Sequence, residues 1–184
     1  MSAGRYSRDE AMRMLASRRL TLEPQVAAHA PAMFEVLCDP ALYEYENEPP
    51  PSVEWLRRRF TRLEARQSGD GRQQWLNWVI RLPSGDLAGY VQATVTGDGR
   101  AAVAYVLHSA HWGSGLAGEA VGAMIGELSA RYDVHTLNAV LKRGNLRSRR
   151  LLERLGFSTA PAEAQAALEV EPDELLMVRH LVAR

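Results

Sequence analysis

The sequence has 184 residues, of which 46% are apolar and 24% charged, as expected for one globular domain. The 22 basic residues balance the 22 acidic ones, so the charge gives no reason to expect nucleic acid or a membrane surface as a partner. The single cysteine, Cys38, excludes an internal disulfide and a multi-cysteine metal site, and it suits a reducing compartment. No apolar run approaches the roughly 18 residues of a membrane span. We therefore expect a cytoplasmic protein.

Turn and capping residues divide the chain into alternating helices and strands. Pro24 ends a short alternating strand, Ser52 is a favourable N-cap, and Gly156 ends the last helix. The expected elements are a short helix in an N-terminal extension at 1–17, a strand at 19–24, helices at 25–40 and 53–66, strands at 75–82, 87–95 and 101–108, a helix to about 132, a strand at 134–142, a helix at 143–157 and a strand at 173–182. Residues 18–184 are expected to form one α/β (α+β) domain, with a mixed, mostly antiparallel sheet of about six or seven strands and helices on both faces.

Residues 111–120, HWGSGLAGEA, follow a strand and begin a helix. Amide groups at a helix N-terminus are unpaired and partly positive, and glycines let an anion approach them closely. The segment lies in the single strand–helix–strand crossover, where open sheets place ligands. We interpret Gly113, Gly115 and Gly118 as an anion-binding cradle, and Gly122 and Gly126 as close packing of the helix. Neither a Walker motif nor the acidic residue of a dinucleotide site is present, which argues against a dinucleotide-dependent oxidoreductase.

A second segment, RGNLRSRRLLERLGF at 143–157, has the pattern of an amphipathic helix. Its leucines form a core side, and its arginines form a basic surface at Arg143, Arg147, Arg149, Arg150 and Arg154. Asn145 fits an N-cap or a functional role equally well.

Together these two segments resemble the GNAT superfamily of acyl-CoA-dependent N-acyltransferases, in particular its RimJ/RimL-like branch. The branch pattern is approximately Tyr-Trp-Gly-x-Gly-x-Ala-x-Glu-Ala, followed by Asn-x-x-Ser and a later Gly-Phe. The matching residues are Trp112, Gly113, Gly115, Ala117, Glu119, Ala120, Asn145, Ser148, Gly156 and Phe157. RRLTLEP, DPALYEYENEPP and DELLMVRHL extend the resemblance over roughly residues 18–183.

The resemblance implies an acetyl-CoA site and a role for each matching residue. The backbone amides of Trp112, Gly113, Ser114, Gly115, Leu116, Ala117 and Gly118 would hold the pyrophosphate. The Leu107 backbone would pair with the pantetheine arm and polarise the thioester carbonyl, and Asn145 would contact the cofactor near its reactive end. Ser148 would donate a proton to the departing CoA thiolate. The amine would attack directly in a ternary complex, without a metal or a covalent enzyme intermediate. Family members are often monomers or homodimers.

This chain departs from the family pattern at the general base. Many relatives have a carboxylate on the strand before the first motif, whereas this chain has Ala101 and Ala102 there. The base is therefore water, another side chain, or absent. Its absence leaves open a non-catalytic acyl-CoA-binding regulatory module.

The acceptor side is predicted in the loop YEYENEPPP, which carries Tyr43, Glu44, Tyr45 and Glu46. In the family this loop lies over the acceptor, and its carboxylates, Glu48 included, would attract a cationic amine. A solvated acidic loop is the equally simple alternative. We expect a primary amine on a protein or peptide N-terminus, or on a small molecule such as an amino sugar.

The remaining candidate residues have simpler interpretations. His108 and His111 flank the first motif, but two histidines in a loop do not make a metal site. Cys38 is interpreted as a small buried residue because no basic neighbour activates it. Trp55, Trp75 and Trp78 are expected in the core or at an interface, and Trp112 is expected to pack beside the cradle.

Overall fold

One open sheet organises the computed structural model, in which residues 12–45 and 47–181 are described. Its strand order is β1-β2-β3-β4-β5-β6-β8-β7. The strands are β1 (Leu15–Ala16), β2 (Thr21–Pro24), β3 (Gln73–Arg81), β4 (Leu87–Thr96), β5 (Arg100–Leu107), β6 (Thr136–Lys142), β7 (Ser158–Thr159) and β8 (Glu174–His180). The α-helices are α1 (Ala30–Leu37), α2 (Val53–Leu63), α3 (Leu116–Arg131), α4 (Leu146–Arg154) and α5 (Ala162–Ala167), and short 3-10 turns lie at Ala27–His29, Pro40–Tyr43 and Ser109–His111.

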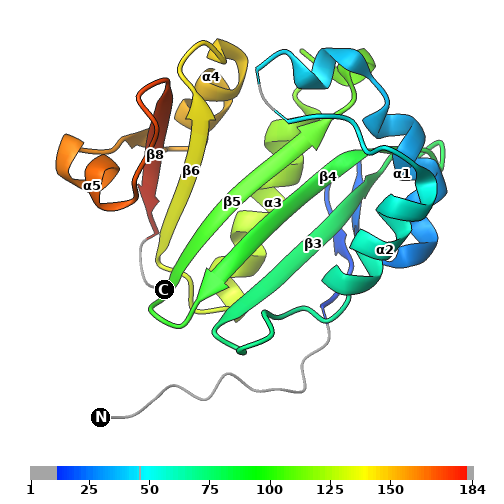
Figure 1. Ribbon diagram of the computed structural model, residues 1–184, viewed down its shortest axis with the longest axis horizontal. Coiled ribbons are helices and arrows are strands. Elements are labelled where there is room, and N and C mark those ends of the chain that lie inside the picture. The colour runs from blue at the N-terminus through cyan, green and yellow to red at the C-terminus, as the bar shows by residue number, and fades with distance from the viewer. Residues whose placement is uncertain (1–11, 46, 182–184) are drawn as a thin grey trace.

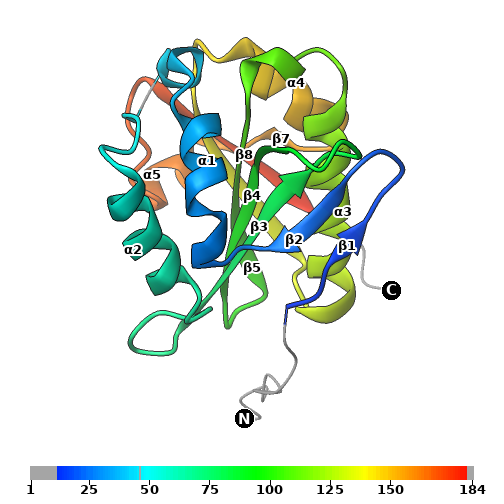
Figure 2. The same cartoon turned by 90° about the vertical axis from the view of Figure 1, so that its right-hand side faces the viewer.

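Helices cover both faces of the sheet (Figures 1 and 2). On one face, α1 and α2 bury Met33, Leu56 and Phe60 against Val79 of β3. On the other face, α3 and α4 cover the larger core, in which alternate residues of β3 to β6 point toward them. The alternation follows from the two-residue period of a strand, which sends successive side chains to opposite faces.

β5 and β6 form the parallel pair of the sheet, and they stay together over only three positions. The paired residues are Arg100 with Thr136, Ala101 with Leu137, and Ala102 with Asn138. Beyond them the strands diverge, while β6 remains paired with β8 along its whole length. Figure 1 shows the resulting gap widening toward the C-terminal ends of β5 and β6. This gap (between 103–107 and 139–142) is called the splayed gap below.

The mixed, mostly antiparallel sheet with helices on both faces is confirmed, with two differences. The sheet has eight strands rather than six or seven. It includes β1 and β7, which are two residues long and therefore too short to show a sequence pattern. Leu15 and Ala16 form β1, so the helix predicted within 1–17 does not include them. Residues 1–11 of that extension lie outside the described residues. The described end of the extension is held against the core by Arg13. The Arg13 guanidinium pairs with the buried Glu127, and the Arg13 carbonyl accepts a hydrogen bond from the Trp78 indole.

Two local predictions are confirmed and one is wrong. Ser52 caps α2 by accepting from Trp55 N–H at 3.1 Å, and Gly156 ends α4 with φ of 81°. Cys38 is exposed rather than buried. Trp55 lies on the outer side of α2 with 39% exposure, so it is not a core residue, and its place at an interface stays a prediction. No helix among residues 12–45 and 47–181 is long and apolar enough to cross a membrane.

Candidate acyl-CoA site

The last residues of β5 direct backbone groups into the splayed gap. His108 N–H donates to Ala88 O, so the alternation of an antiparallel ladder turns the N–H and C=O groups of Tyr105 and Leu107 away from β4, toward β6. The Leu107 carbonyl is already used, because the Trp112 indole donates to it at 2.7 Å. The Leu107 N–H is therefore the group placed to bind a ligand in the gap.

The turn after β5 presents a run of unpaired amides at the start of α3. Gly113 and Gly115 adopt φ of 76° and 80°, the left-handed region that favours glycine, and Gly115 is the N-cap of α3. Within the described part of the chain, six consecutive N–H groups donate to no protein oxygen: those of Gly113, Ser114, Gly115, Leu116, Ala117 and Gly118. These six groups are called the amide cradle. With the partial positive charge of the helix N-terminus, they suit an anion such as a phosphate.

The backbone of Trp112 differs from its predicted role, whereas its side chain packs against the core as predicted. Its backbone N–H donates to Ser109 O at 3.0 Å, so it does not belong to the amide cradle. Its side chain instead links the two halves of the site. The indole holds the Leu107 carbonyl, and the guanidinium carbon of Arg147 on α4 lies 3.6 Å from the ring centroid. A stacked cation over a tryptophan face is a favourable contact.

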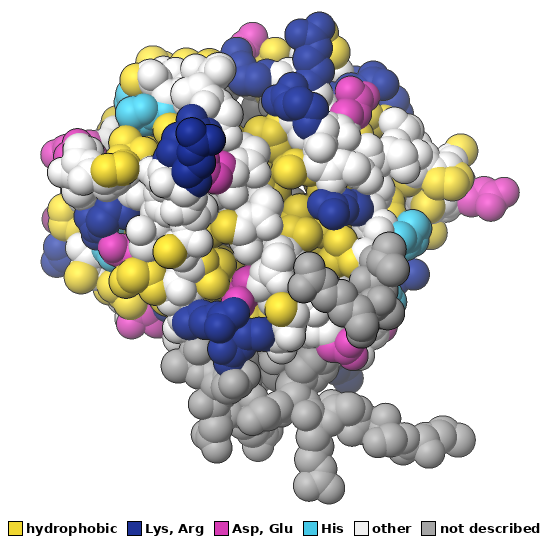
Figure 3. Space-filling view, turned by 180° about the vertical axis from the view of Figure 1, so that it is seen from behind, with side chains coloured by type: hydrophobic (Ala, Val, Ile, Leu, Met, Phe, Trp, Pro, Cys, Tyr) yellow, Lys and Arg dark blue, Asp and Glu magenta, His cyan; other side chains and the backbone are white. Residues whose placement is uncertain are grey.

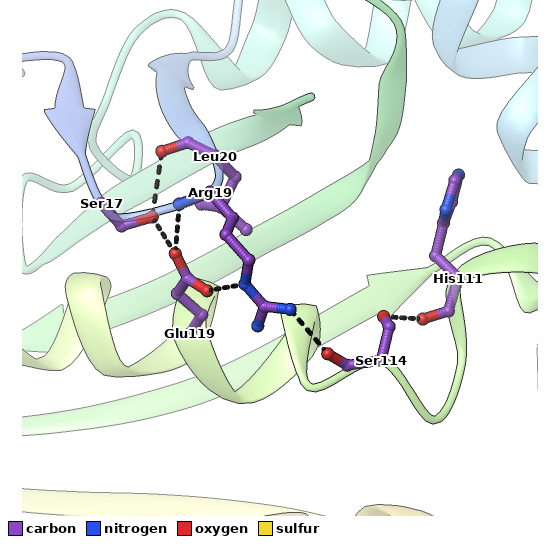
Figure 4. A network of polar contacts seen from close by, with 6 residues as sticks. All are labelled: Ser17, Arg19, Leu20, His111, Ser114 and Glu119. Atoms are coloured by element: carbon purple, nitrogen blue, oxygen red, sulfur yellow. Dashed lines mark hydrogen bonds and ion pairs between the residues drawn. The ribbon is translucent and has the colours of Figure 1, made fainter. Parts of the chain in front are cut away.

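An ion pair that the sequence did not reveal links the start of α3 to the glycine loop (Figure 4). Glu119, on the first turn of α3, accepts from Arg19 N and Nε at 2.7 Å each and from the Ser17 hydroxyl at 2.8 Å. Arg19 Nη1 also donates to Ser114 O at 2.8 Å. Burial raises the pKa of Glu119, but the hydrogen bonds from Arg19 and Ser17 outweigh it and hold the pKa below its ordinary value. The β1–β2 turn therefore fixes both the helix start and the glycine loop.

The α4 side of the gap is built around Asn145 and Ser148. Asn145 is the N-cap of α4, and its Oδ1 accepts from Ser148 N–H at 3.0 Å. The capping prediction is confirmed, and the Asn145 Nδ2 group makes no hydrogen bond with a described residue. The Ser148 hydroxyl lies 2.6 Å from the Tyr105 hydroxyl of β5, so one pair of side chains spans the gap. Burial raises the pKa of Tyr105, and the hydrogen bond to Ser148 opposes this rise.

Basic side chains gather around this end of the molecule. Figure 3 shows Lys and Arg side chains clustered at the top of the rear face, the end at which α4 lies in Figure 1. Arg143, Arg147, Arg150 and Arg154 are exposed, whereas Arg149 pairs with Glu153 along α4. Such a surface favours an anionic ligand.

The acidic loop after α1 reaches the same end of the gap. The Tyr43 hydroxyl donates to Leu37 O, and burial raises its pKa to about 12, so it is fixed to α1. Tyr45 packs over the β6–α4 turn, since its ring is 3.4 Å from the position of a Cβ on Gly144. Glu44 is exposed, and Glu46 lies outside the described residues. The loop is joined to the β5–α3 turn by Asp39, which accepts from Ser109 N–H at 2.8 Å.

Other candidate residues are separate from the gap. His108 and His111 line a pocket of about 510 Å³ between α1 and the β3–β4 turn, together with His29 and Glu35. In residues 12–45 and 47–181, no group of three His, Cys, Asp or Glu side chains could hold a metal ion. Ala101 and Ala102 have methyl side chains, so neither supplies a base.

The packing role predicted for the later glycines is wrong. A Cβ added to Gly122 or Gly126 would meet no non-neighbouring atom within 4 Å among the described residues. A Cβ added to Gly118 would also meet no such atom within 4 Å, so the Gly118 backbone is accessible. The glycine stripe therefore faces away from the sheet, and the helix approaches the core through Ala120, Val121 and Met124 instead.

Solved structures share this fold over nearly the whole chain. RimL, the ribosomal L7/L12 alpha-N-protein acetyltransferase solved with coenzyme A, is 17% identical, with a TM-score of 0.78 over 94% of this chain and 100% of that one. A putative GNAT-family acetyltransferase from Bordetella pertussis is 24% identical (TM-score 0.71, 91% and 99% covered). AAC(6')-Ib, solved with ribostamycin and coenzyme A, is 21% identical (TM-score 0.69, 89% and 94% covered).

No curated protein sequence matches the chain. The family model described as "Acetyltransferase (GNAT) domain" does match, over residues 19–158, which contain the splayed gap, the amide cradle, Asn145 and Ser148. With this match over most of the sequence and the same fold in the solved structures, the chain belongs to the GNAT acetyltransferase family.

Proposed function

We propose that this acetyltransferase moves an acetyl group from acetyl-CoA directly to a primary amine within a ternary complex, as RimJ/RimL-like enzymes do. The amide cradle is the observation that carries the proposal. Six unpaired N–H groups in a row are costly unless water or a ligand satisfies them, and a pyrophosphate offers enough oxygen acceptors. The open space around Gly113 and Gly118 lets such a group reach the backbone.

In this proposal the residues on the β5 side and on the α4 side of the gap have different roles. Leu107 N–H binds the pantetheine arm and helps to polarise the thioester carbonyl, and Asn145 Nδ2 contacts the cofactor near its reactive end. The acceptor amine first loses the extra proton of its cationic form to water, and the lone pair of its neutral nitrogen then forms the new C–N bond. The C–S bond breaks, and the electron pair of that bond leaves with the sulfur. Ser148 gives its proton to that sulfur, the amine releases its own proton to water, and water restores the serine.

The acceptor is assigned to the acidic loop side. Glu44 and Glu46 attract a cationic amine, and Tyr45 places the loop beside the β6–α4 turn. Two of the relatives represent two kinds of acceptor chemistry, a ribosomal protein N-terminus for RimL and the aminoglycoside ribostamycin bound to AAC(6')-Ib. A protein or peptide N-terminus and an amino sugar are accordingly the two acceptor classes to test. The single cysteine supports a reducing compartment such as the cytoplasm.

A panel of amines tests the proposal against the non-catalytic alternative. The protein is incubated with acetyl-CoA and peptides with free N-termini, or with amino sugars, and release of free CoA thiol is measured. Acetylation of one class above the rate of acetyl-CoA hydrolysis supports the enzyme. Tight acetyl-CoA binding with no transfer to any acceptor would favour a binding module, for which the missing carboxylate at Ala101 and Ala102 is the motivating observation.

A further inference from the structure

Tyr105 is placed where it can act on Ser148. It lies on β5 three residues beyond the last position paired with β6, in the splayed part of the sheet. Its side chain points to the α3 and α4 face and packs against the large core. From there the hydroxyl reaches α4 on the other side of the gap, where it lies 2.6 Å from Ser148 Oγ and, in a longer and weaker contact, 3.3 Å from Ser148 O.

The acidity of the two hydroxyls indicates which one donates in the short contact. A phenol is much more acidic than an aliphatic alcohol, so the Tyr105 O–H is the better donor and Ser148 Oγ the better acceptor. Burial raises the pKa of Tyr105 and keeps its proton in place. With one lone pair of Ser148 Oγ bound to Tyr105, the single serine proton is left to point elsewhere.

Other contacts fix the serine backbone and leave its proton available. Ser148 N–H donates to the Asn145 cap, which sets the first turn of α4. No described residue other than Tyr105 makes a hydrogen bond with Ser148 Oγ. The serine hydroxyl is therefore held from the β5 side, with its proton directed away from the tyrosine.

We infer that Tyr105 is a positioning residue, which holds Ser148 as the proton donor to the departing thiolate. This inference rests on the proposed acetyl transfer. The tyrosine gives up no proton itself, because burial disfavours its phenolate more than Ser148 and the positive charge of Arg154 favour it, so its pKa is raised. Its hydrogen bond strengthens as Ser148 Oγ gains negative charge while the serine proton moves to sulfur, so it acts mainly in the transition state.

A double-mutant cycle tests this role. Tyr105→Phe keeps the ring in the core and should lower kcat about tenfold, with less than a twofold change in acetyl-CoA Kd. Ser148→Ala should lower kcat about a hundredfold. The double variant should be no slower than Ser148→Ala, because the tyrosine has nothing left to position. In a Ser148→Thr background, which keeps a hydroxyl, Tyr105→Phe should again slow the reaction.

The control is Tyr132→Phe at the opposite end of α3, which removes a tyrosine hydroxyl far from the gap. Its effect on kcat should be small and should add to that of Ser148→Ala. Thermal unfolding of every variant checks that it is folded. If Tyr105→Phe slows the Ser148→Ala enzyme as much as it slows the wild type, the tyrosine is structural and the inference is wrong. An unchanged kcat in Ser148→Ala also overturns it. Calorimetry on the wild type separates these results from failure of the proposed function, which would appear as no acetyl-CoA binding at all.

Discussion

Arg19 and Glu119 are 100 residues apart in sequence, yet the Glu119 carboxylate receives both the backbone N–H and the Nε of Arg19 at 2.7 Å. The same guanidinium donates to Ser114 O inside the glycine loop. The ion pair thus connects the β1–β2 turn, the first turn of α3 and the amide cradle. Because charge-assisted hydrogen bonds are directional, this arrangement fixes the loop in the conformation that presents its amides.

Arg19→Met should weaken acetyl-CoA binding about tenfold, which corresponds to about 1.4 kcal/mol, because the loop loses its anchor at Ser114. Calorimetric titration with acetyl-CoA measures the change. Arg18→Met is the matched control, since the neighbouring Arg18 is exposed. Equal affinities for both variants would show that the Arg19 contacts do not order the loop.

The same pair predicts how stability depends on pH. The folded-state pKa of Glu119 is lowered, so its ionised form stabilises the protein above the ordinary value of 4.5, and this contribution is lost as the pH falls through the lower folded value. Wild type should therefore be more stable than Glu119→Gln at pH 7, and the difference should shrink below pH 4.5. Denaturant unfolding of both proteins at several pH values measures it. A difference that stays constant down to pH 3 contradicts the role given to the carboxylate.

Trp112→Phe removes the indole donor to Leu107 O and weakens the stacking of Arg147. We expect a loss of about 1 kcal/mol in unfolding free energy and about fivefold weaker acetyl-CoA binding, because the end of β5 becomes less ordered. Trp75→Phe is the control, since that indole donates to Gln73 at the other end of the sheet. If acetyl-CoA binding is unchanged in Trp112→Phe, the indole is not needed to hold the Leu107 backbone in position for the ligand.

Substitutions of the glycines of the α3 region by alanine should have two opposite effects on the unfolding free energy. Gly126→Ala and Gly122→Ala each should raise the unfolding free energy by about 0.5–1 kcal/mol, because an added methyl group has open space and alanine favours the helix. Gly115→Ala should lower it by about 1–2 kcal/mol, since the residue has φ of 80°. Thermal unfolding ranks the three variants. Destabilisation by Gly126→Ala would mean that the stripe contacts something after all.

Neutralising the carboxylates of the acidic loop should weaken the binding of a cationic acceptor. Glu44→Gln combined with Glu46→Gln should raise acceptor KM about threefold at low ionic strength, and less at high salt, where the attraction is screened. Steady-state kinetics with the best amine of the panel measures KM in both conditions. Glu54→Gln, on the exposed first turn of α2, is the control. An acceptor KM that does not change at either salt concentration removes this loop from the acceptor site.

Much of the fold could be predicted from the sequence because its signals are local. Ser52 and Asn145 cap helices through contacts three residues away, and the glycines before α3 mark a turn through their backbone angles. The amide cradle is also a local feature, because its N–H groups are unpaired as a result of where α3 begins. The Trp112 amide is bonded to Ser109 and does not belong to the amide cradle, which the sequence could not show because this bond depends on a short 3-10 turn.

Contacts between distant segments could not be predicted in this way. In the sequence Arg19 is one of two adjacent arginines before a strand, and only the folded chain brings it to Glu119. Tyr105 alternates with its neighbours on β5 like any half-buried residue, and its partner becomes visible only when β5 and β6 diverge. The outward direction of the glycine stripe was misread because glycine repeats look the same on either face of a helix.

The most direct test of the acyl-CoA site is calorimetric titration of the wild-type protein and Gly115→Ala with acetyl-CoA at low ionic strength. The amide cradle predicts one site per chain with a Kd on the order of micromolar for wild type, and binding at least tenfold weaker for the variant, in a protein that remains folded. Equal affinities for the two proteins, or no binding to wild type, would contradict an acetyl-CoA site at the start of α3.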